Sequence, residues 1–316
     1  MLSIPDAVAL QADAAATKVR ATRTPWRFLV SAMLAGLWVG VGVFVMFSAA
    51  GPFYVADDPA TRLVSGAVFA IALTLVVFAG AELATSAMMI LPMGVMRRTI
   101  TWFQGVRTLA FVLVGNFLGS LLLAWVLIQS GIFHDGATGG MLDGILTSKM
   151  SHTASETFFL GILCNVLVCV AIWAASRVRS EAAKAILIFW GVFGFIASGF
   201  EHVVANMTIF GIGVLGGASV DVTWLDLGHN LLWAGLGNLV GGMVVMAMGY
   251  TFIAGRRDRD GSSADALVAD SLDGADASVE SGSPVTVAAD AADAAGELAG
   301  ERAARPAGAR EPQPAV

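Results

Sequence analysis

The sequence predicts an all-α membrane protein with six transmembrane helices, and three observations carry this prediction. Of the 316 residues, 57% are hydrophobic and only 13% are charged, whereas soluble domains average about 25% charged residues. The charges are unevenly spread, because residues 28–255 hold 18 of the 42 and residues 256–316 hold another 18. Six apolar blocks lie within residues 28–255, and four of them have about the 20 residues that span a bilayer. This composition argues against an ordinary soluble enzyme.

The chain divides into three parts. Residues 1–27 contain no Lys or Arg before Lys18, unlike a cleavable signal peptide, and we expect a short helix on the cytoplasmic membrane surface. Residues 28–255 form the predicted membrane channel domain, with apolar blocks at 28–50, 63–96, 107–130, 154–176, 185–217 and 229–254. Residues 256–316 carry the whole formal charge of −6 and show no helical stripe of large apolar side chains, which predicts a disordered acidic cytoplasmic tail.

The second and fifth blocks are too long for a single crossing. They cover 34 and 33 residues, so an unbroken helix would be about 50 Å long, more than tilting usually absorbs. We therefore expect the second and fifth helices to be broken, at Gly80 and Gly199, where glycine permits unwinding. Glu82, Glu201 and His202 lie beside these glycines and are the ionisable residues well inside the apolar blocks. Such residues usually mark a cavity or a pathway.

The two halves of the domain repeat each other at an offset of about 120 residues. Gly80-Ala81-Glu82 matches Gly199-Phe200-Glu201, and the run GNFLG at 115–119 matches GNLVG at 237–241. Three crossings per half would make these inverted repeats, with the substrate path where the broken helices meet. We expect the two glutamates to cap freed amides at the breaks. Asn116 and Asn238 are expected to form interhelical hydrogen bonds.

The distribution of basic residues predicts the orientation of a multi-pass protein in the cell membrane. An even number of crossings puts both termini on one side, which then collects thirteen Lys and Arg residues, and leaves only Arg62 and Lys149 on the other. The positive-inside rule makes the side with thirteen cytoplasmic. Residues 1–255 balance at twelve acids and twelve bases, so a basic surface for nucleic acid is excluded.

The residues around the two expected breaks resemble the formate/nitrite transporter family. Residues 198–207 read SGFEHVVANM, which follows the family pattern S-G-F-E-H-x-x-A-N-M throughout. Residues 79–86 resemble its second-helix loop motif, and residues 149–165 resemble its lysine-to-fourth-helix segment. The resemblance covers about residues 25–255. It implies a homopentameric, aquaporin-like channel in the lipid bilayer for small weak-acid anions, such as formate or nitrite, and protons.

The resemblance also implies roles for individual residues. His202 would be the central pore histidine, Thr85 the loop residue facing it, Lys149 a lysine at the periplasmic vestibule and Asn165 an asparagine of the fourth helix. All four would line the substrate pore. The periplasmic constriction would consist of Phe69, Leu73 and Phe195, and Leu83 would take one position of the cytoplasmic constriction. The family often has Phe in place of Ala84, so we expect a cytoplasmic slit that is wider or closed by another side chain. Structural roles at the breaks fall to Gly80, Glu82, Gly199, Glu201 and Asn206.

We hypothesise that Lys149 concentrates the anion and that His202 shares a proton with it between the two constrictions. Imidazole suits this task because it ordinarily titrates near pH 6.5. A membrane anion sensor or binding protein without a through-path remains the alternative. A membrane enzyme is disfavoured because the sequence has no metal cluster, cofactor motif or nucleophile-base constellation. An aquaporin-type solute channel is weakened, since Met207 follows Asn206 where an Asn-Pro-Ala motif would continue.

Overall fold

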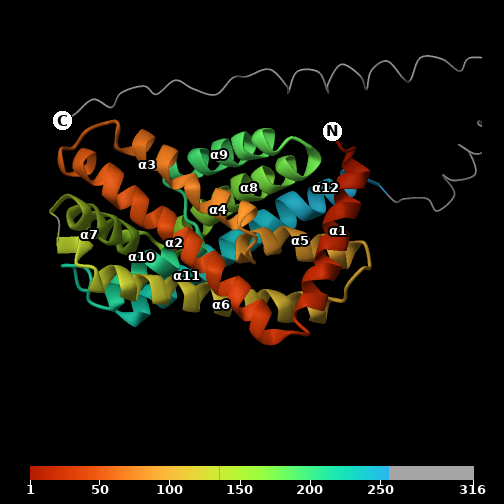
Figure 1. Ribbon diagram of the computed structural model, residues 1–316, viewed down its shortest axis with the longest axis horizontal. Helices are drawn as coiled ribbons and strands as arrows, with labels where there is room; N and C mark the ends of the chain where they lie inside the picture. The colour runs from red at the N-terminus through yellow and green to blue at the C-terminus, as the bar shows by residue number, and fades with distance from the viewer. Residues whose placement is uncertain (135, 256–316) are drawn as a thin grey trace, which may run out of the picture. The chain divides into compact units, whose positions relative to one another are not determined.

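The computed structural model describes residues 1–134 and 136–255, and every regular element in these two ranges is a helix (Figure 1). In chain order the helices are α1 (Ile4–Ala21), α2 (Pro25–Val55), α3 (Thr61–Phe69), α4 (Ile71–Phe78), α5 (Ala84–Met96), α6 (Trp102–Gln129), η1 (Ile132–His134), α7 (Gly136–Ser151), α8 (Ala154–Arg177), α9 (Glu181–Ala197), α10 (Val203–Val214), α11 (Trp224–Val240), the π-helical η2 (Gly241–Met248) and α12 (Gly249–Ile253). The predicted acidic tail at 256–316 lies outside the described residues.

Five helical stretches are long and apolar enough to cross a membrane within the described ranges. They are Pro25–Val55, Thr61–Phe78, Trp102–Gln129, Ala154–Arg177 and Trp224–Ile253. The fifth apolar block supplies none of these five, because it is divided into α9 with 17 residues and α10 with 12. Helix α7 lies outside all six apolar blocks, and no hydropathy signal pointed to it.

Close backbone contacts between small residues hold the long helices together. Helix α2 packs along α6, where a Cβ added to Gly119 would collide with the carbonyl oxygen of Met33. Helix α8 packs along α11 in the same manner, with Gly161 against the Cα of Gly237. Lipid tails are as apolar as Leu, so helices in a bilayer associate largely through such close van der Waals packing.

Helix α1 packs against one end of the bundle, beside α5 and α12 (Figure 1). Ala7, Val8, Ala12 and Ala15 form its buried face. The Leu2 amide donates to the Arg177 carbonyl at 2.8 Å, and the Arg177 side chain donates back to the Leu2 carbonyl at 3.1 Å. These bonds fasten the start of the chain to the end of α8.

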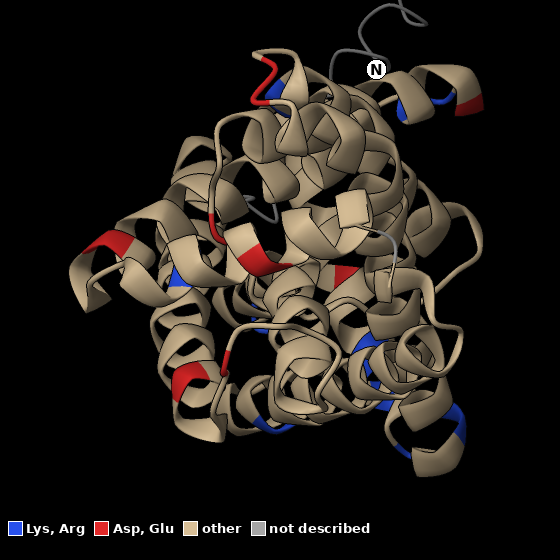
Figure 2. Ribbon diagram, turned by 90° about the vertical axis from the view of Figure 1, so that its left-hand side faces the viewer, with Lys and Arg blue, Asp and Glu red and all other residues tan. Residues whose placement is uncertain are grey.

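Charged residues are sparse on the described helices, and Figure 2 shows them as a few separate blue and red segments on a largely uncharged ribbon. Large apolar side chains such as Trp125, Phe159 and Trp190 are instead more than half exposed. An apolar exterior over long helices is what a bilayer requires. The chain is a multi-pass membrane protein.

The Gly119 contact yields a stability prediction. Gly119→Ala should lower the apparent melting temperature of the detergent-solubilised protein, because the added methyl group forces α2 and α6 apart at a cost of about 1–3 kcal/mol. Gly228→Ala is the matched control, since a Cβ there meets no atom within 4 Å and alanine favours a helix by about 1 kcal/mol over glycine. Equal melting temperatures for the two variants would contradict this account of the packing.

Candidate functional site: two helix breaks and the pockets beside them

Both long apolar blocks are interrupted near their middle. The second block is non-helical between Phe78 and Ala84, and the fifth between Ala197 and Val203. The backbone turns through the left-handed region at Gly80 (φ 75°) and Gly199 (φ 74°). Glycine adopts such angles without the penalty that a Cβ imposes. The interruptions therefore begin at the two positions that the sequence predicted.

At each interruption one asparagine side chain forms hydrogen bonds with backbone groups that have lost their partners in the helix. The Asn116 side chain accepts from the Ala84 amide at 2.9 Å and donates to the Glu82 and Ala32 carbonyls at 2.8 Å. Asn238 accepts from the Val203 amide at 2.9 Å and donates to the Gly161 and Glu201 carbonyls at 2.8 Å. Both asparagines are fully buried. The matching GN dipeptides of the two halves thus perform matching tasks.

This arrangement corrects the expectation that Glu82 and Glu201 cap the freed amides. Among the described contacts, their carboxylates form ion pairs instead. Glu82 pairs with Lys18 from α1, and Glu201 pairs with Lys149 at the end of α7. A neutral asparagine offers both a donor and an acceptor, which an ionised carboxylate does not. One asparagine can therefore satisfy an amide and two carbonyls at once.

Glu201 lies at the centre of a buried polar cluster, with only 1% of its side chain exposed. The Lys149 ammonium donates to both carboxylate oxygens at 2.8 Å, and the Asn206 amide donates to Oε2 at 2.5 Å. Asn206 also donates to Asn230 at 2.7 Å. Because a buried carboxylate is costly without partners, this cluster stabilises the start of α10.

His152 lies beside the same carboxylate and was not identified from the sequence. Its Nδ1 is 3.5 Å from Glu201 Oε1. This interaction raises the pKa of His152 above its ordinary value of 6.5, against the opposing effect of burial. His152 follows Lys149 by three residues, close to one helical turn, and that spacing was the available signal.

His202 and Thr85 meet where the two interruptions approach each other. His202 Nδ1 accepts from the Ala205 amide at 3.1 Å, so His202 caps α10. Nδ1 then carries no proton, and the ring proton sits on Nε2, which is 3.1 Å from Thr85 Oγ1. Nε2 therefore donates to the threonine oxygen. Thr85 is left with its hydroxyl proton, for which the described residues offer no hydrogen-bond acceptor.

Aromatic rings cover His202 on one side. Phe195 stacks on the imidazole, with ring centroids 5.6 Å apart, and Phe69 meets Phe195 edge-on at 6.0 Å. Leu73 is buried at 4% exposure and Leu83, which precedes Thr85 by two residues, at 1%. Two of the three residues expected at the periplasmic constriction are therefore in contact with each other beside the histidine.

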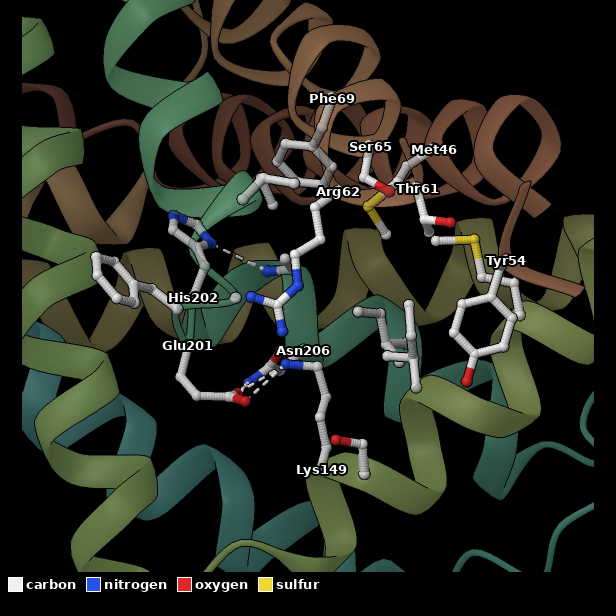
Figure 3. Close-up of a pocket in the computed structure, with 18 of the residues that line it drawn as sticks. Met46, Tyr54, Thr61, Arg62, Ser65, Phe69, Lys149, Glu201, His202 and Asn206 are labelled. Carbon is white, nitrogen blue, oxygen red and sulfur yellow. Dashed lines mark hydrogen bonds and ion pairs between the residues drawn. The ribbon is translucent and has the colours of Figure 1, made fainter. Parts of the chain in front are cut away.

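A pocket of about 750 Å³ opens on the side of Glu201 (Figure 3). Its lining includes Phe69, Lys149, His202 and Asn206, together with Arg62 from the first turn of α3. A smaller pocket of about 350 Å³ adjoins the other interruption and is lined by Gly80, Ala81, Glu82 and Ser86, among others. In the sequence Arg62 contributed only to a charge count, because nothing in its neighbourhood distinguished it.

Asn165 was expected to line the pore and lies instead among backbone groups. Its amide donates to the carbonyls of Asn238 at 2.6 Å and Thr85 at 3.2 Å. Asn165 is fully buried and is absent from the lining of both described pockets. It ties α8 to the first turn of α5 and to α11, which makes it a positioning residue.

Apolar helices, two interruptions with their backbone groups satisfied and polar pockets beside them define a membrane channel or transporter. The family model for formate/nitrite transporters matches residues 6–252. The nitrite transporter NirC of Salmonella typhimurium is 39% identical over 249 residues, which are 78% of this chain and 91% of that protein. The formate channel FocA of Haemophilus influenzae is 34% identical over 254 residues, 72% of this chain and 87% of that protein.

Solved structures agree with these relatives. A structure described as an FNT family ion channel superposes with a TM-score of 0.72 at 38% identity, covering 78% of this chain and 98% of that one. A pentameric formate channel with formate bound superposes with a TM-score of 0.65 at 30% identity, covering 74% and 98%. The chain belongs to the formate/nitrite transporter family.

The pairing of His152 with Glu201 predicts a pH-dependent stability. Because the folded-state pKa is raised, protonated His152 stabilises the fold fully below about pH 6.5 and loses this effect as the pH rises through the folded pKa. His152→Gln should therefore lower the apparent melting temperature more at about pH 5.5 than at about pH 8.5. His134→Gln, at an exposed histidine, is the control. An equal loss at both pH values would show that the ion pair contributes nothing.

Proposed function

We propose that this protein is a membrane channel for small monovalent weak-acid anions such as formate or nitrite. The observation that carries the proposal is the His202–Thr85 hydrogen bond. His202 lines the larger pocket, and the residue after Thr85 lines the smaller one. The pair therefore stands between two polar pockets, beside the Phe69 and Phe195 rings. The names of the relatives, which are transporters and channels, support transport and not catalysis.

The proposed topology has six crossings arranged as two inverted three-helix repeats. The second crossing would combine α3, α4 and α5, and the fifth would combine α9 and α10. The equivalent hydrogen bonds of Asn116 and Asn238 support this repeat. Both termini would be cytoplasmic by the positive-inside rule, with α1 on the inner membrane surface. One of the solved relatives is pentameric, which supports a homopentamer built from aquaporin-like protomers.

Desolvation determines which form of the substrate passes. Between Phe69, Leu73 and Phe195 on one side and Leu83 on the other, an anion would lose most of its hydration. The free-energy cost of this desolvation is far smaller for the neutral acid. We propose that a proton joins the anion at His202 before the neutral acid crosses. The proton arrives from the aqueous side through the larger pocket as hydronium, which leaves water behind. It does not come from Nδ1 of His202, because that nitrogen accepts from the Ala205 amide and carries no proton.

The geometry supports the Thr85 hydroxyl as the donor that meets the anion. His202 directs its Nε2 proton to Thr85, and the Thr85 hydroxyl can then donate a hydrogen bond to a substrate oxygen. Lys149 faces the larger pocket with two hydrogen bonds to Glu201. An ammonium has three donors, so Lys149 keeps one N–H for an arriving anion. Glu82, Asn165 and Asn206 hold the two interruptions in place.

The competing possibility is an anion sensor whose pockets never connect. Stopped-flow swelling of proteoliposomes separates the two. A channel makes the vesicles swell in isosmotic formate or nitrite, faster than protein-free vesicles. A sensor binds the anion, measured by a shift in melting temperature, without accelerating the swelling.

The same vesicles test the histidine. His202→Phe keeps an aromatic ring against Phe195 and removes the donor to Thr85. A hydrogen bond to a charged group is worth about 1.5–3 kcal/mol, so we expect the flux to fall by about tenfold or more and its pH dependence to change. His134→Phe, at an exposed histidine, should leave both unchanged. Wild-type flux and pH dependence in His202→Phe would reject the proposed role of the ring.

Thr85 offers a second, independent test, because substitutions can remove its hydroxyl group or its methyl group one at a time. Thr85→Ser keeps the hydroxyl and should retain most of the flux. Thr85→Val is nearly isosteric but leaves the His202 Nε2 proton without an acceptor, and it should reduce flux by about tenfold. Similar flux in the two variants would mean that Thr85 serves packing alone.

A further inference from the structure

The larger pocket is lined by two basic side chains, and only one of them, Lys149, forms an ion pair within the described residues. Lys149 is 13% exposed and bound to both oxygens of a buried carboxylate. Arg62 lines the same pocket from the first turn of α3 and is exposed. Its guanidinium has no ion-pair or hydrogen-bond partner in residues 1–134 and 136–255. An anion entering the pocket therefore meets a guanidinium without a direct ion-pair partner at Arg62 and an ion-paired ammonium at Lys149.

The direction of the Arg62 side chain suits contact with a ligand. Figure 3 shows it extending from α3 into the pocket, with the guanidinium away from its own helix. Phe69, two helical turns further along α3, lines the same pocket and contacts Phe195. The arginine therefore belongs to the helix face that leads to the aromatic pair beside His202.

We propose that Arg62 is the first residue of the larger pocket to bind the substrate, and that it selects anions that carry two oxygens on one atom. This inference rests on the proposed channel function and deepens it. A guanidinium presents parallel N–H donors, which bind two oxygens at once in a planar fork. Formate and nitrite are bent anions with two such oxygens, whereas chloride offers a single centre. Lys149 then receives the anion by one hydrogen bond deeper in the pocket.

Two carboxylates near Arg62 weaken its long-range attraction for an anion, but they leave its guanidinium free for direct hydrogen bonds with that anion. Asp57 and Asp58 line the same pocket, but neither carboxylate forms an ion pair with the guanidinium among the described residues. Asp58 instead accepts from the Ala60 amide at 2.8 Å. The preference of Arg62 should therefore derive mainly from direct hydrogen bonds, with a smaller contribution from the field.

The test measures formate and nitrite flux into proteoliposomes as a function of anion concentration, with and without chloride as a competitor, for wild type, Arg62→Gln and Arg62→Lys. A unit charge about 4 Å from an anion in water changes its affinity by about fivefold. Arg62→Gln should raise the half-saturating concentration of formate and nitrite by about that factor at low salt, with maximal flux retained. The increase should shrink at about 1 M salt, where the screening length falls to ~3 Å.

Arg62→Lys separates charge from geometry. It should keep the salt-dependent part of the half-saturating concentration and make formate and nitrite flux more sensitive to inhibition by chloride. Arg179→Gln is the control for net charge, because Arg179 is exposed and lines neither described pocket. Each variant must elute as wild type does in size-exclusion chromatography, so that altered flux is not a folding defect.

The outcomes distinguish this inference from the proposed function. Wild-type flux with unchanged half-saturation and selectivity in both Arg62 variants overturns the role of Arg62 and leaves the channel standing. Wild-type protein that carries neither formate nor nitrite overturns the channel and this inference with it. An increase in half-saturation that Arg179→Gln reproduces equally would assign the effect to net charge, and this too overturns a specific Arg62 contact.

Discussion

A backbone that leaves the helix inside a bilayer frees amide and carbonyl groups that lipid cannot satisfy, and the rest of this structure depends on how those groups find partners. Asn116 does this at one interruption and Asn238 at the other. Each side chain accepts a hydrogen bond from one backbone amide and donates to two backbone carbonyls. Both belong to helices that pack tightly on a neighbour through glycine. The close packing brings each amide within reach, and the hydrogen bonds in turn hold the packing.

Rigid interruptions allow short polar side chains to be placed accurately. His202 caps α10 through Nδ1, which orients the opposite ring nitrogen toward Thr85. Thr85 in turn lies in the first turn of α5, whose start is held by Asn116. The two residues are 117 positions apart in the chain. Their contact is a consequence of both interruptions being anchored, because a shift of either helix start would separate them.

The carboxylates at the two interruptions are paired with lysines, unlike several charged residues that are more exposed. Each interruption carries a glutamate, and each glutamate is paired with a lysine from a segment outside the interrupted helices, namely α1 for Glu82 and α7 for Glu201. Burying a carboxylate requires such a partner. Under the proposed function, this pairing would leave hydrogen bonding and desolvation to discriminate at His202, and attraction of the anion to the more exposed residues of the larger pocket.

Local properties of the chain were enough to predict the helical membrane class, the two interrupted blocks and the residues that flank them, because hydropathy, glycine and intramembrane charge can be recognised within one segment. The resemblance indicated the family, which the relatives confirm. The partners of each polar group emerged only from the fold. Asparagines and not glutamates cap the breaks, Asn165 braces the backbone, and His152 and Arg62 line the larger pocket. These roles depend on distances between segments far apart in the chain, which no local pattern encodes.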